Sequence, residues 1–542
     1  MKKSLLFLLA LTMCSILKSE AQNAPSIDWQ KSLGGSGDDE SSSVQQTSDG
    51  GFIIAGESSS TDIDVSGNHG QNDYWIVKID ATGTIEWQKS LGGTSPDFGS
   101  SIHQTTDGGF IVAGFSRSND GDVTGHHGTT STSDYWIVKL DSVGTIEWEK
   151  SLGGTLNEFG NSVQQTTDGG FVVAGYSLSN DGDVTGHHGG AGGADYWIVK
   201  LSGSGSLTWE KSLGGNSADY GNSIQQTTDG GFIVAGASSS NDNDVSGNHG
   251  LSDFWIVKLD SAGVITWQKC LGGSDDDQAF SIEQTTDGGF ITAGYTKSNT
   301  GDVSFNHGSF DYWVVKLDSA GTLVWQKSLG GSSAELSNSI EQTADDGYIV
   351  AGYTASFGGD VTGNHGGTFW GDYWVVKLDG SGTIVWQKCL GGTNDDVATA
   401  VQETTAGGFI ITGWSESGNG DLTVNYGLAD VWVVLLNVPT TIDPAGDLTF
   451  SSRVFPNPAT NLITLQLKLQ KADIAYPGTN SHDATITINN VLGEPLFEKT
   501  SPFINGNLDE EIFLDNHFTP GMYLVKISSG EQHWNKPLMV IK

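Results

Sequence analysis

The stretch NSVQQTTDGGFVVAGYSLSNDGDVTGHHGGAGGADYWIVKLSGSGSLTWEKSLGG, residues 161–215, decides the fold because most of the chain repeats it with small changes. Its closing element, W-[QE]-K-[SC]-L-G-G, occurs seven times at intervals of 58 or 61 residues. A second element, D-[YFV]-W-[IV]-V, also occurs seven times. A fixed period of this size predicts a solenoid, an array or a propeller.

Each repeat contains four short runs typical of β-strands. In the quoted copy they are 162–166, 170–176, 196–201 and 206–213. The first two runs are joined by Asp168-Gly169, which is a hairpin signal because glycine tolerates a positive φ. No segment has the apolar spacing of a long amphipathic helix. Four antiparallel strands in about 60 residues are typical of one blade of a β-propeller.

The two ends of the repeat array predict a closed ring. The seventh repeat supplies three strands and then runs into 438–440 without a fourth, whereas Ile27–Leu33 is a fourth strand with no blade before it. If this N-terminal strand completes the last blade, no sheet edge stays open. We therefore predict an all-β protein, with a seven-bladed β-propeller over 22–437 and its repeated tryptophans packed between blades.

Composition limits the partners and the cellular location. With 25 Lys and Arg against 64 Asp and Glu, the net charge is −39, which argues against nucleic acid and against an anionic membrane surface. Residues 1–21 resemble a secretion signal peptide, with a basic start at Lys2-Lys3 and cleavage after Ala21. No other run approaches the ~20 apolar residues of a transmembrane helix. Cys270 and Cys389 occupy equivalent positions in non-adjacent repeats, so we expect no disulfide between them.

The loop between the second and third strands carries a recurring Asp and, in six copies, a recurring His. The copies that contain N-D-G-D resemble calcium loops in residue type, and their candidate ligands are Asp120, Asp122, Asp181 and Asp183. Calcium is the one candidate cofactor. The alternative is that each Asp bonds backbone N–H groups of its own loop. We expect each His to pack within its loop, because a metal site needs converging ligands.

Aromatic residues mark places where single blades depart from the repeat. We predict that Phe369, Trp370, Trp414 and Tyr426 contribute to ligand binding on the loop face of the ring, because aromatic rings near acids and amides suit sugars or peptides. No nucleophile–base pair stands out, so no catalytic residue is assigned and we do not expect an enzyme. The loop after each L-G-G is expected on the same face, and its acids predict that this face is strongly acidic.

From about Arg453 the repeat ends and a separate domain is predicted. Residues 438–452 are expected to form a linker, and six strand-like runs over 453–542 predict a small β-sandwich. Pro537 predicts that the last strand lies at a sheet edge. The motif residues of this tail are Pro456, Asn457, Pro458, Gly493, Gly521, Tyr523 and Lys536.

On these motifs the tail resembles the C-terminal sorting domain of type IX secretion cargo. The resemblance implies passage through the periplasm to the outer cell surface or the medium. It also implies two partners, the type IX machinery and a sortase-like peptidase that removes the tail. The repeat region is similar to uncharacterised propellers of such cargo, and that similarity implies no activity.

Three functions stay open for the ring. We expect a secreted or surface-bound binding or adhesion protein that recognises a glycan or a protein, because rigid rings offer broad loop faces. An extracellular hydrolase of polysaccharide or peptide is the alternative, and a structural surface protein is a third. The near-identity of the blades favours binding, because catalysis needs asymmetric, converging acids.

Overall fold

The computed structural model describes residues 24–190, 193–367 and 370–437, and in the tail 450–455, 462–469, 483–490, 495–502, 507–514, 517–519, 521–529 and 532–540. The predicted signal peptide, Phe369 and most of the predicted linker lie outside these residues. The chain divides into two compact units, Met1–Thr441 and Ile442–Lys542. The described residues form strands and no helices.

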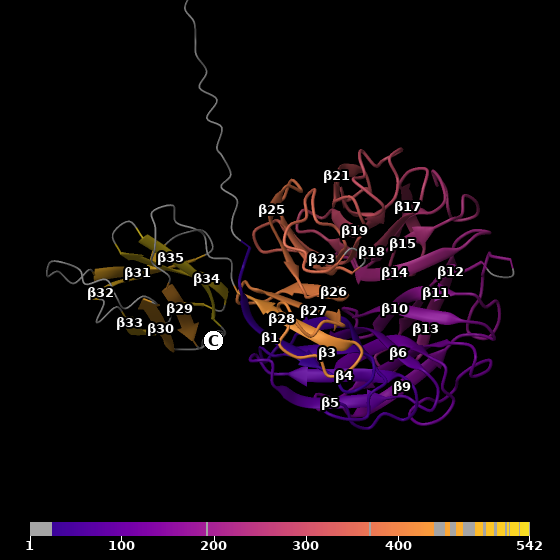
Figure 1. Ribbon diagram of the computed structural model, residues 1–542, viewed down its shortest axis with the longest axis horizontal. Helices are drawn as coiled ribbons and strands as arrows, with labels where there is room; N and C mark the ends of the chain where they lie inside the picture. Colours follow the sequence, from indigo (N-terminus) through magenta and orange to yellow (C-terminus); the bar gives the residue numbers. More distant parts are fainter. Residues whose placement is uncertain are drawn as a thin grey trace, which may run out of the picture. The chain divides into compact units, whose positions relative to one another are not determined.

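The first unit contains seven four-stranded antiparallel sheets, one for each repeat (Figure 1). Blade 1 is β2 (Asp39–Gln46), β3 (Phe52–Ser58), β4 (Asp73–Ile79) and β5 (Ile85–Leu91). Blade 2 is β6 (Asp97–Gln104), β7 (Phe110–Ser116), β8 (Asp134–Leu140) and β9 (Ile146–Leu152). Blade 3 is β10 (Glu158–Gln165), β11 (Phe171–Ser177), β12 (Asp195–Leu201) and β13 (Leu207–Leu213). Blades 4 and 5 are β14 (Asp219–Gln226), β15 (Phe232–Ser238), β16 (Asp253–Leu259) and β17 (Ile265–Leu271); and β18 (Asp277–Gln284), β19 (Phe290–Thr296), β20 (Asp311–Leu317) and β21 (Leu323–Leu329). Blade 6 is β22 (Glu335–Gln342), β23 (Tyr348–Thr354), β24 (Asp372–Leu378) and β25 (Ile384–Leu390).

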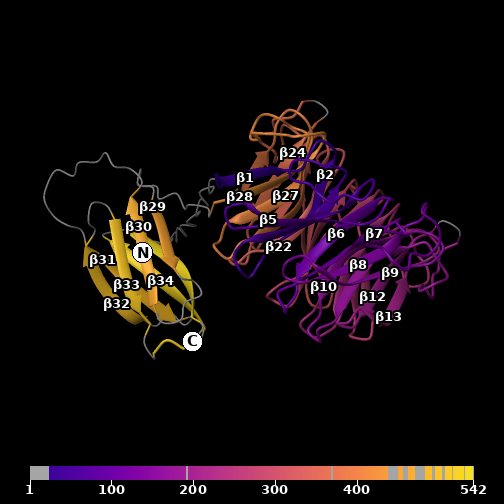
Figure 2. The ribbon, with the colours of Figure 1, turned by 90° about the horizontal axis from the view of Figure 1, so that it is seen from below.

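The seventh blade joins the two ends of the array. It contains β26 (Asp396–Glu403), β27 (Phe409–Ser415) and β28 (Asp430–Leu436), and β1 (Ile27–Leu33) pairs antiparallel with β28. In Figures 1 and 2 the indigo β1 lies beside the orange β28. Gln30 is opposite Val434, and the Asn437 N–H donates to the carbonyl of Ser26 at 2.9 Å. The predicted ring closure is confirmed.

The innermost strand of each blade begins before the predicted run. In blade 3 the prediction started at residue 162, whereas β10 starts at Glu158 because a β-bulge between Gly160 and Ser162 restores pairing with β11. The facing strand needs a glycine at this point, because a Cβ on Gly175 would lie 1.9 Å from the carbonyl oxygen of Phe159. The polar residues before the bulge hid this part of the strand from the apolar pattern.

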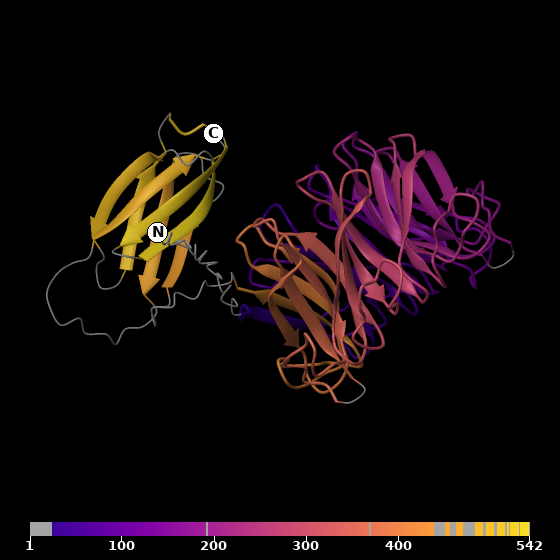
Figure 3. The same cartoon turned by 90° about the horizontal axis from the view of Figure 1, so that it is seen from above.

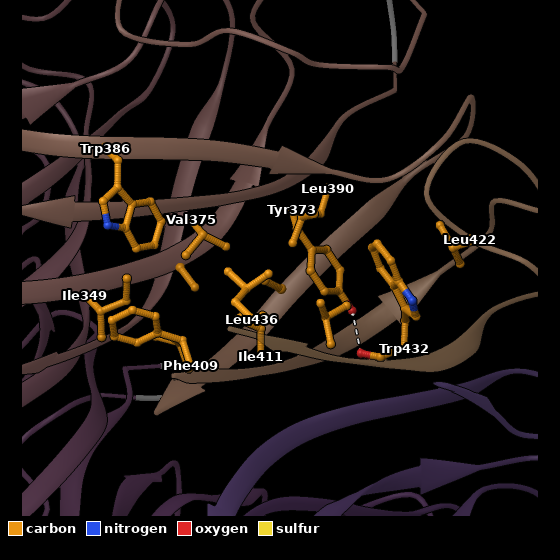
Figure 4. Close-up of a cluster of buried hydrophobic side chains, with 14 residues drawn as sticks. Ile349, Tyr373, Val375, Trp386, Leu390, Phe409, Ile411, Leu422, Trp432 and Leu436 are labelled. Atoms are coloured by element: carbon orange, nitrogen blue, oxygen red, sulfur yellow. Dashed lines mark hydrogen bonds between the residues drawn. The ribbon is translucent and has the colours of Figure 1, made fainter. Parts of the chain in front are cut away.

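Aromatic pairs hold neighbouring blades together, as predicted for the tryptophans. Tyr373 of blade 6 lies with its ring 4.8 Å from that of Trp432 in blade 7, and its hydroxyl donates to the Trp432 carbonyl at 3.0 Å (Figure 4). Six of the seven blade boundaries carry such a Tyr–Trp or Phe–Trp pair, and at the seventh Val431 packs in one cluster with Trp75. These rings are fully buried, so each boundary is a continuous apolar core. Cys270 and Cys389 are buried, free and in different clusters.

The second unit contains two sheets, as predicted for a sandwich (Figures 2 and 3). One sheet has the order β29 (Phe450–Phe455), β30 (Leu462–Leu469), β33 (Asn507–Phe513), and the other β32 (Pro495–Pro502), β31 (Asp483–Asn490), β34 (Gly521–Ser529), β35 (Gln532–Val540). Their shared core includes Ile512 and Ile488. Pro537 lies in the edge strand β35, as predicted.

The boundary of the predicted linker needs a correction. β29 begins at Phe450, so the last three residues of the predicted linker 438–452 belong to the sandwich. The sequence pattern missed this strand because Ser451 and Ser452 interrupt its apolar residues.

Candidate functional site

The loops that precede the first strand and follow the second strand of a blade lie on one face of the ring. The Asp122 N–H donates to the Gly92 carbonyl at 2.9 Å, and Gly92 N–H donates back to Asp122 Oδ2 at 3.2 Å. Thr94 likewise bonds Asp120 through its N–H and its hydroxyl, both at 2.8 Å. We call this side of the ring the loop face. Both kinds of loop carry acidic side chains, so these side chains gather on the loop face, as the sequence predicts.

The candidate calcium ligands are all engaged in these loop contacts. In blade 3, Asp181 accepts from Thr155 N–H and Oγ1 at 2.8 and 2.9 Å, and Asp183 accepts from Gly153 N–H at 3.2 Å, as their counterparts do in blade 2. Within the described part of the chain, no group of three or more His, Cys, Asp or Glu side chains is placed to hold a metal ion. Calcium binding stays a prediction, and these contacts match the alternative in which the acids shape their loops.

Each recurring histidine bonds a buried carboxylate that sequence reasoning did not pair with it. His69 contacts Asp73 Oδ2 through its backbone N–H at 2.9 Å and through Nδ1 at 2.7 Å. Burial raises the pKa of Asp73 to about 6, although the histidine opposes this shift. Blade 7 has Tyr426, whose backbone N–H bonds Asp430 in the same way. The same contact recurs in the pairs His127–Asp134, His188–Asp195, His249–Asp253, His307–Asp311 and His365–Asp372.

A second fully buried acid stands beside each of these carboxylates, on the next blade. Asp97 starts β6 and accepts hydrogen bonds from Gly93 N–H at 2.8 Å and Ser118 Oγ at 2.9 Å. A Cβ on Gly92 would lie 2.4 Å from Asp97 Oδ2 and 3.0 Å from Asp73 Oδ1, so both acids face this glycine. In all seven blades the oxygen equivalent to Asp73 Oδ1 is buried without a hydrogen-bond partner. We call these seven pairs the junction carboxyls.

The axis of the ring is a narrow polar channel. Its cavity of about 220 Å³ is lined by the innermost strands of all seven blades, mainly by serine and asparagine. Side chains of one blade accept from backbone N–H groups of the next, as in Ser101 Oγ to Val163 N–H at 3.2 Å and Gln45 Oε1 to Gln104 N–H at 2.6 Å. The channel wall therefore ties the blades together and uses few charges.

An aromatic collar surrounds the channel mouth on the loop face. Its members lie at two paired positions, the second residue of the first strand and the sixth of the second strand. Blades 2 and 3 have an aromatic residue at both positions and blades 4 to 7 at one, and all are at least partly exposed. The rings of blades 2 to 4 contact each other in series, with centroids 4.7–5.0 Å apart. The aromatic collar consists of Phe98, Phe115, Phe159, Tyr176, Tyr220, Tyr295, Tyr353 and Trp414.

Blade 1 replaces both collar positions with acids. Glu40 and Glu57 are opposite each other in the register of β2 and β3. Burial, and then the neighbouring Glu40 charge, raises the pKa of Glu57 to about 8, although Asn72 Nδ2 donates to it at 3.5 Å. Burial, Asp38 and Glu416 raise the pKa of Glu40. We call Glu40 and Glu57 the acidic gap.

The repeat geometry places the acidic gap between two aromatic residues. The second-strand ring of one blade contacts the first-strand ring of the next, as Phe115 contacts Phe159 at 4.7 Å. Trp414 of blade 7 occupies the Phe115 position, so its neighbour across the blade boundary is Glu40. Two basic side chains of the loops on this face have their own partners: Lys297 binds Asp276 at 3.3 Å, and Arg117 donates to Ser133.

The predicted ligand residues are placed as follows. Trp414 belongs to the aromatic collar. Trp370 is 45% exposed on the blade 6 loop, and the next residue, Gly371, packs against the ring of Tyr353. Tyr426 is 41% exposed on the blade 7 loop, outside the collar. Sequence reasoning missed the acidic gap. An alignment of the repeats shows it, because the first repeat has a glutamate at both collar positions.

The tail has its own recognisable features. In the sandwich, Tyr523 is buried and its hydroxyl donates to the Thr519 carbonyl at 2.8 Å, beside Gly521 at the start of β34. Lys536 lies in β35, while Pro456, Asn457, Pro458 and Gly493 fall outside the described residues. Residues 453–541 match a family model described as the secretion system C-terminal sorting domain. The tail is a type IX secretion sorting domain.

This sorting domain indicates export to the cell surface or secretion, and handling by the type IX machinery. Among the described residues no helix is long and apolar enough to cross a membrane. Regulatory protein FlaEY of Caulobacter vibrioides is 25% identical over 405 residues, which cover 73% of this chain and 37% of that protein. The chain thus spans little more than a third of that curated relative.

Several solved structures are similar to this chain at low identity. The Neurospora crassa Pan2 WD40 domain is 11% identical with a TM-score of 0.40, and the match covers 76% of this chain and 96% of that one. Sqt1 from Chaetomium thermophilum is 11% identical with a TM-score of 0.38, covering 76% and 99%. Puromycin hydrolase is 10% identical with a TM-score of 0.42, covering 82% and 61%. The strand order of the ring itself establishes the seven blades.

Proposed function

We propose that the ring is an exported binding protein and that its ligand, a glycan or a protein, binds at the aromatic collar. The observation that carries this proposal is the asymmetry of the collar in a ring whose other positions repeat closely. Packing alone would be met by the same residues in every blade. Partly exposed aromatic rings around a rigid mouth supply apolar contact area at little conformational cost.

A screen of the secreted protein against a glycan array and a panel of extracellular matrix proteins tests this function. We expect saturable binding that Trp414→Ser weakens at least tenfold. Phe305→Ser is the matched control, because Phe305 is 57% exposed on a loop and lies outside the collar. Equal binding by both variants would place the ligand elsewhere, and the absence of any ligand would favour a structural surface role. Repeating the screen with a chelator tests the calcium prediction.

One observation favours hydrolysis as a second candidate. Because its pKa is about 8, Glu57 keeps its proton at neutral pH and is able to donate it, while Glu40 faces it from the paired strand. Glycosidases use two carboxyl groups about 5–10 Å apart in this way. Release of reducing ends from a polysaccharide panel, abolished by Glu57→Gln, would support this activity. Binding without turnover would leave the binding function alone.

A further inference from the structure

Within the described part of the chain, no positive charge acts on the acidic gap. Asp38 and Glu416 raise the pKa of Glu40, and Glu40 and Asp38 raise that of Glu57. Asn72, the residue before β4, donates one long hydrogen bond to Glu57. Two acids directly opposite each other on paired strands repel when both are ionised, and Glu57 avoids this repulsion by keeping its proton at neutral pH. The other blades carry aromatic or uncharged residues at these two positions, so the ring keeps a pair of facing acids at one point of its mouth.

The flanks of the acidic gap are apolar. By the repeat geometry, Trp414 borders Glu40 on one side and Phe98 of blade 2 borders Glu57 on the other. A cation between two carboxylates and an aromatic ring gains charge pairing and a cation–π contact. A long methylene stem would contact the collar beside it, as lysine and arginine stems do on apolar surfaces.

We propose that the aromatic collar docks a basic polypeptide segment and that one lysine or arginine side chain of this segment enters the acidic gap. This inference rests on the proposed function and names its ligand class. Charge complementarity selects the occupant: the gap and its surroundings are acidic, and the protein carries a net charge of −39. A neutral glycan would leave the two carboxyls without a counter-charge. One face of the rings in the stacked pairs Phe98–Phe115 and Phe159–Tyr176 is already covered, which leaves less room for sugar stacking.

Proton release gives this proposal a specific signature. A cation favours the ionised form of Glu57, so binding expels a proton wherever the free protein holds one. The affinity should therefore rise with pH up to the pKa of Glu57 and level off above it. The groups that face Glu57 are Glu40 on β2, Asp38 before it and Asn72 before β4, and the first two carry carboxyl groups.

Calorimetric titration of the whole secreted protein tests the proposal with hexa-lysine, hexa-arginine, a glucosamine hexamer and a neutral glucose hexamer, at 150 mM salt. We expect one site per chain for the basic peptides, about tenfold tighter at pH 9 than at pH 6. The variant Glu40→Gln/Glu57→Gln should lose at least tenfold in affinity and show no such rise. The control Asp28→Asn/Asp346→Asn removes the same number of carboxyl groups from exposed positions away from the collar and should lose less than twofold.

The outcomes separate the ligand class from the function. Equal losses in the two double variants would mean non-specific attraction to an acidic surface and would overturn the proposal. Tight binding of either sugar hexamer, sensitive to Trp414→Ser, would overturn the peptide class and leave the binding function standing. Because the glutamine variant removes two acids whose ionised forms burial and the neighbouring acids disfavour, its thermal midpoint should equal or exceed that of the parent, so lost binding is not explained by misfolding.

Discussion

Six blades bury a lysine near the end of the third strand, and its ion pair gives a sharp test of the ring's energetics. Lys258 of β16 is 6% exposed, and its Nζ lies 3.0 Å from Asp229 Oδ2 and 3.0 Å from the Leu259 carbonyl. Asp229 sits in the hairpin turn between β14 and β15. Blade 7 has Leu435 and Ala406 at the two positions, so the pair is replaced as a unit.

In the variant Asp229→Ala, the buried Lys258 ammonium keeps its hydrogen bond to the Leu259 carbonyl but loses its counter-ion. Removing one partner of a buried pair costs about 3–5 kcal/mol, while replacing both by apolar residues is often neutral. Because 65% of the Asp229 side chain is exposed, water reaches this pair and we expect a smaller loss, about 2 kcal/mol. The double variant Lys258→Leu/Asp229→Ala copies blade 7 and should lie within about 1 kcal/mol of the parent.

A double-mutant cycle measured by urea unfolding checks this expectation. Both single variants, the double variant and the parent should show the same dependence on urea concentration, so that midpoints compare directly. The reasoning is refuted if the double variant is as unstable as Asp229→Ala. That result would mean that Asp229 acts only through its turn bonds from Thr227 and Gly231.

Three further predictions concern the ring. Deleting residues 22–35 removes β1 and opens the edge of β28, so the thermal midpoint of the whole ring should fall, as followed by circular dichroism; an unchanged midpoint would contradict closure. Tyr74→Phe leaves the Trp136 carbonyl without its buried donor at 2.8 Å and should lower the free energy of unfolding by about 1–3 kcal/mol, with the exposed Tyr426→Phe as control. Burial raises the pKa of several junction carboxyls, to about 6 for Asp73 and about 7 for Asp396. Their stabilisation is therefore complete below the unfolded pKa near 4 and is lost as the pH rises through 6–7, so the thermal midpoint should drop between pH 5 and pH 8; a flat profile would refute the burial of these two carboxyls.

Much of the fold can be predicted from the repeat pattern, because the apolar residues that become buried recur at the same positions in every repeat. The run Phe171–Gly175 is continuously apolar and is buried on both faces. Strand ends that depend on polar residues were missed. Glu158 begins β10 although its side chain is polar, because its carboxyl group accepts hydrogen bonds from Gly154 N–H and Ser177 Oγ within the blade.

The candidate site was predictable only in part. Trp414 stood out as a departure from the repeat, and the structure places it in the collar. The acidic gap was missed because an alternating strand pattern does not tell which exposed position borders the axis. The loop aspartates resemble calcium ligands in residue type, and residue type alone does not reveal the hydrogen bonds that their oxygens accept from backbone N–H groups such as that of Thr94.

The pairing of β1 with β28 also sets the order of folding events. Gln30 and Val434 are about four hundred residues apart in the chain, so this contact closes a very long loop. Single blades need only local hairpins, which form quickly, whereas non-local pairing is slow. The ring therefore cannot close until the seventh repeat has been synthesised. Until then β1 remains unpaired, because its partner β28 belongs to that repeat.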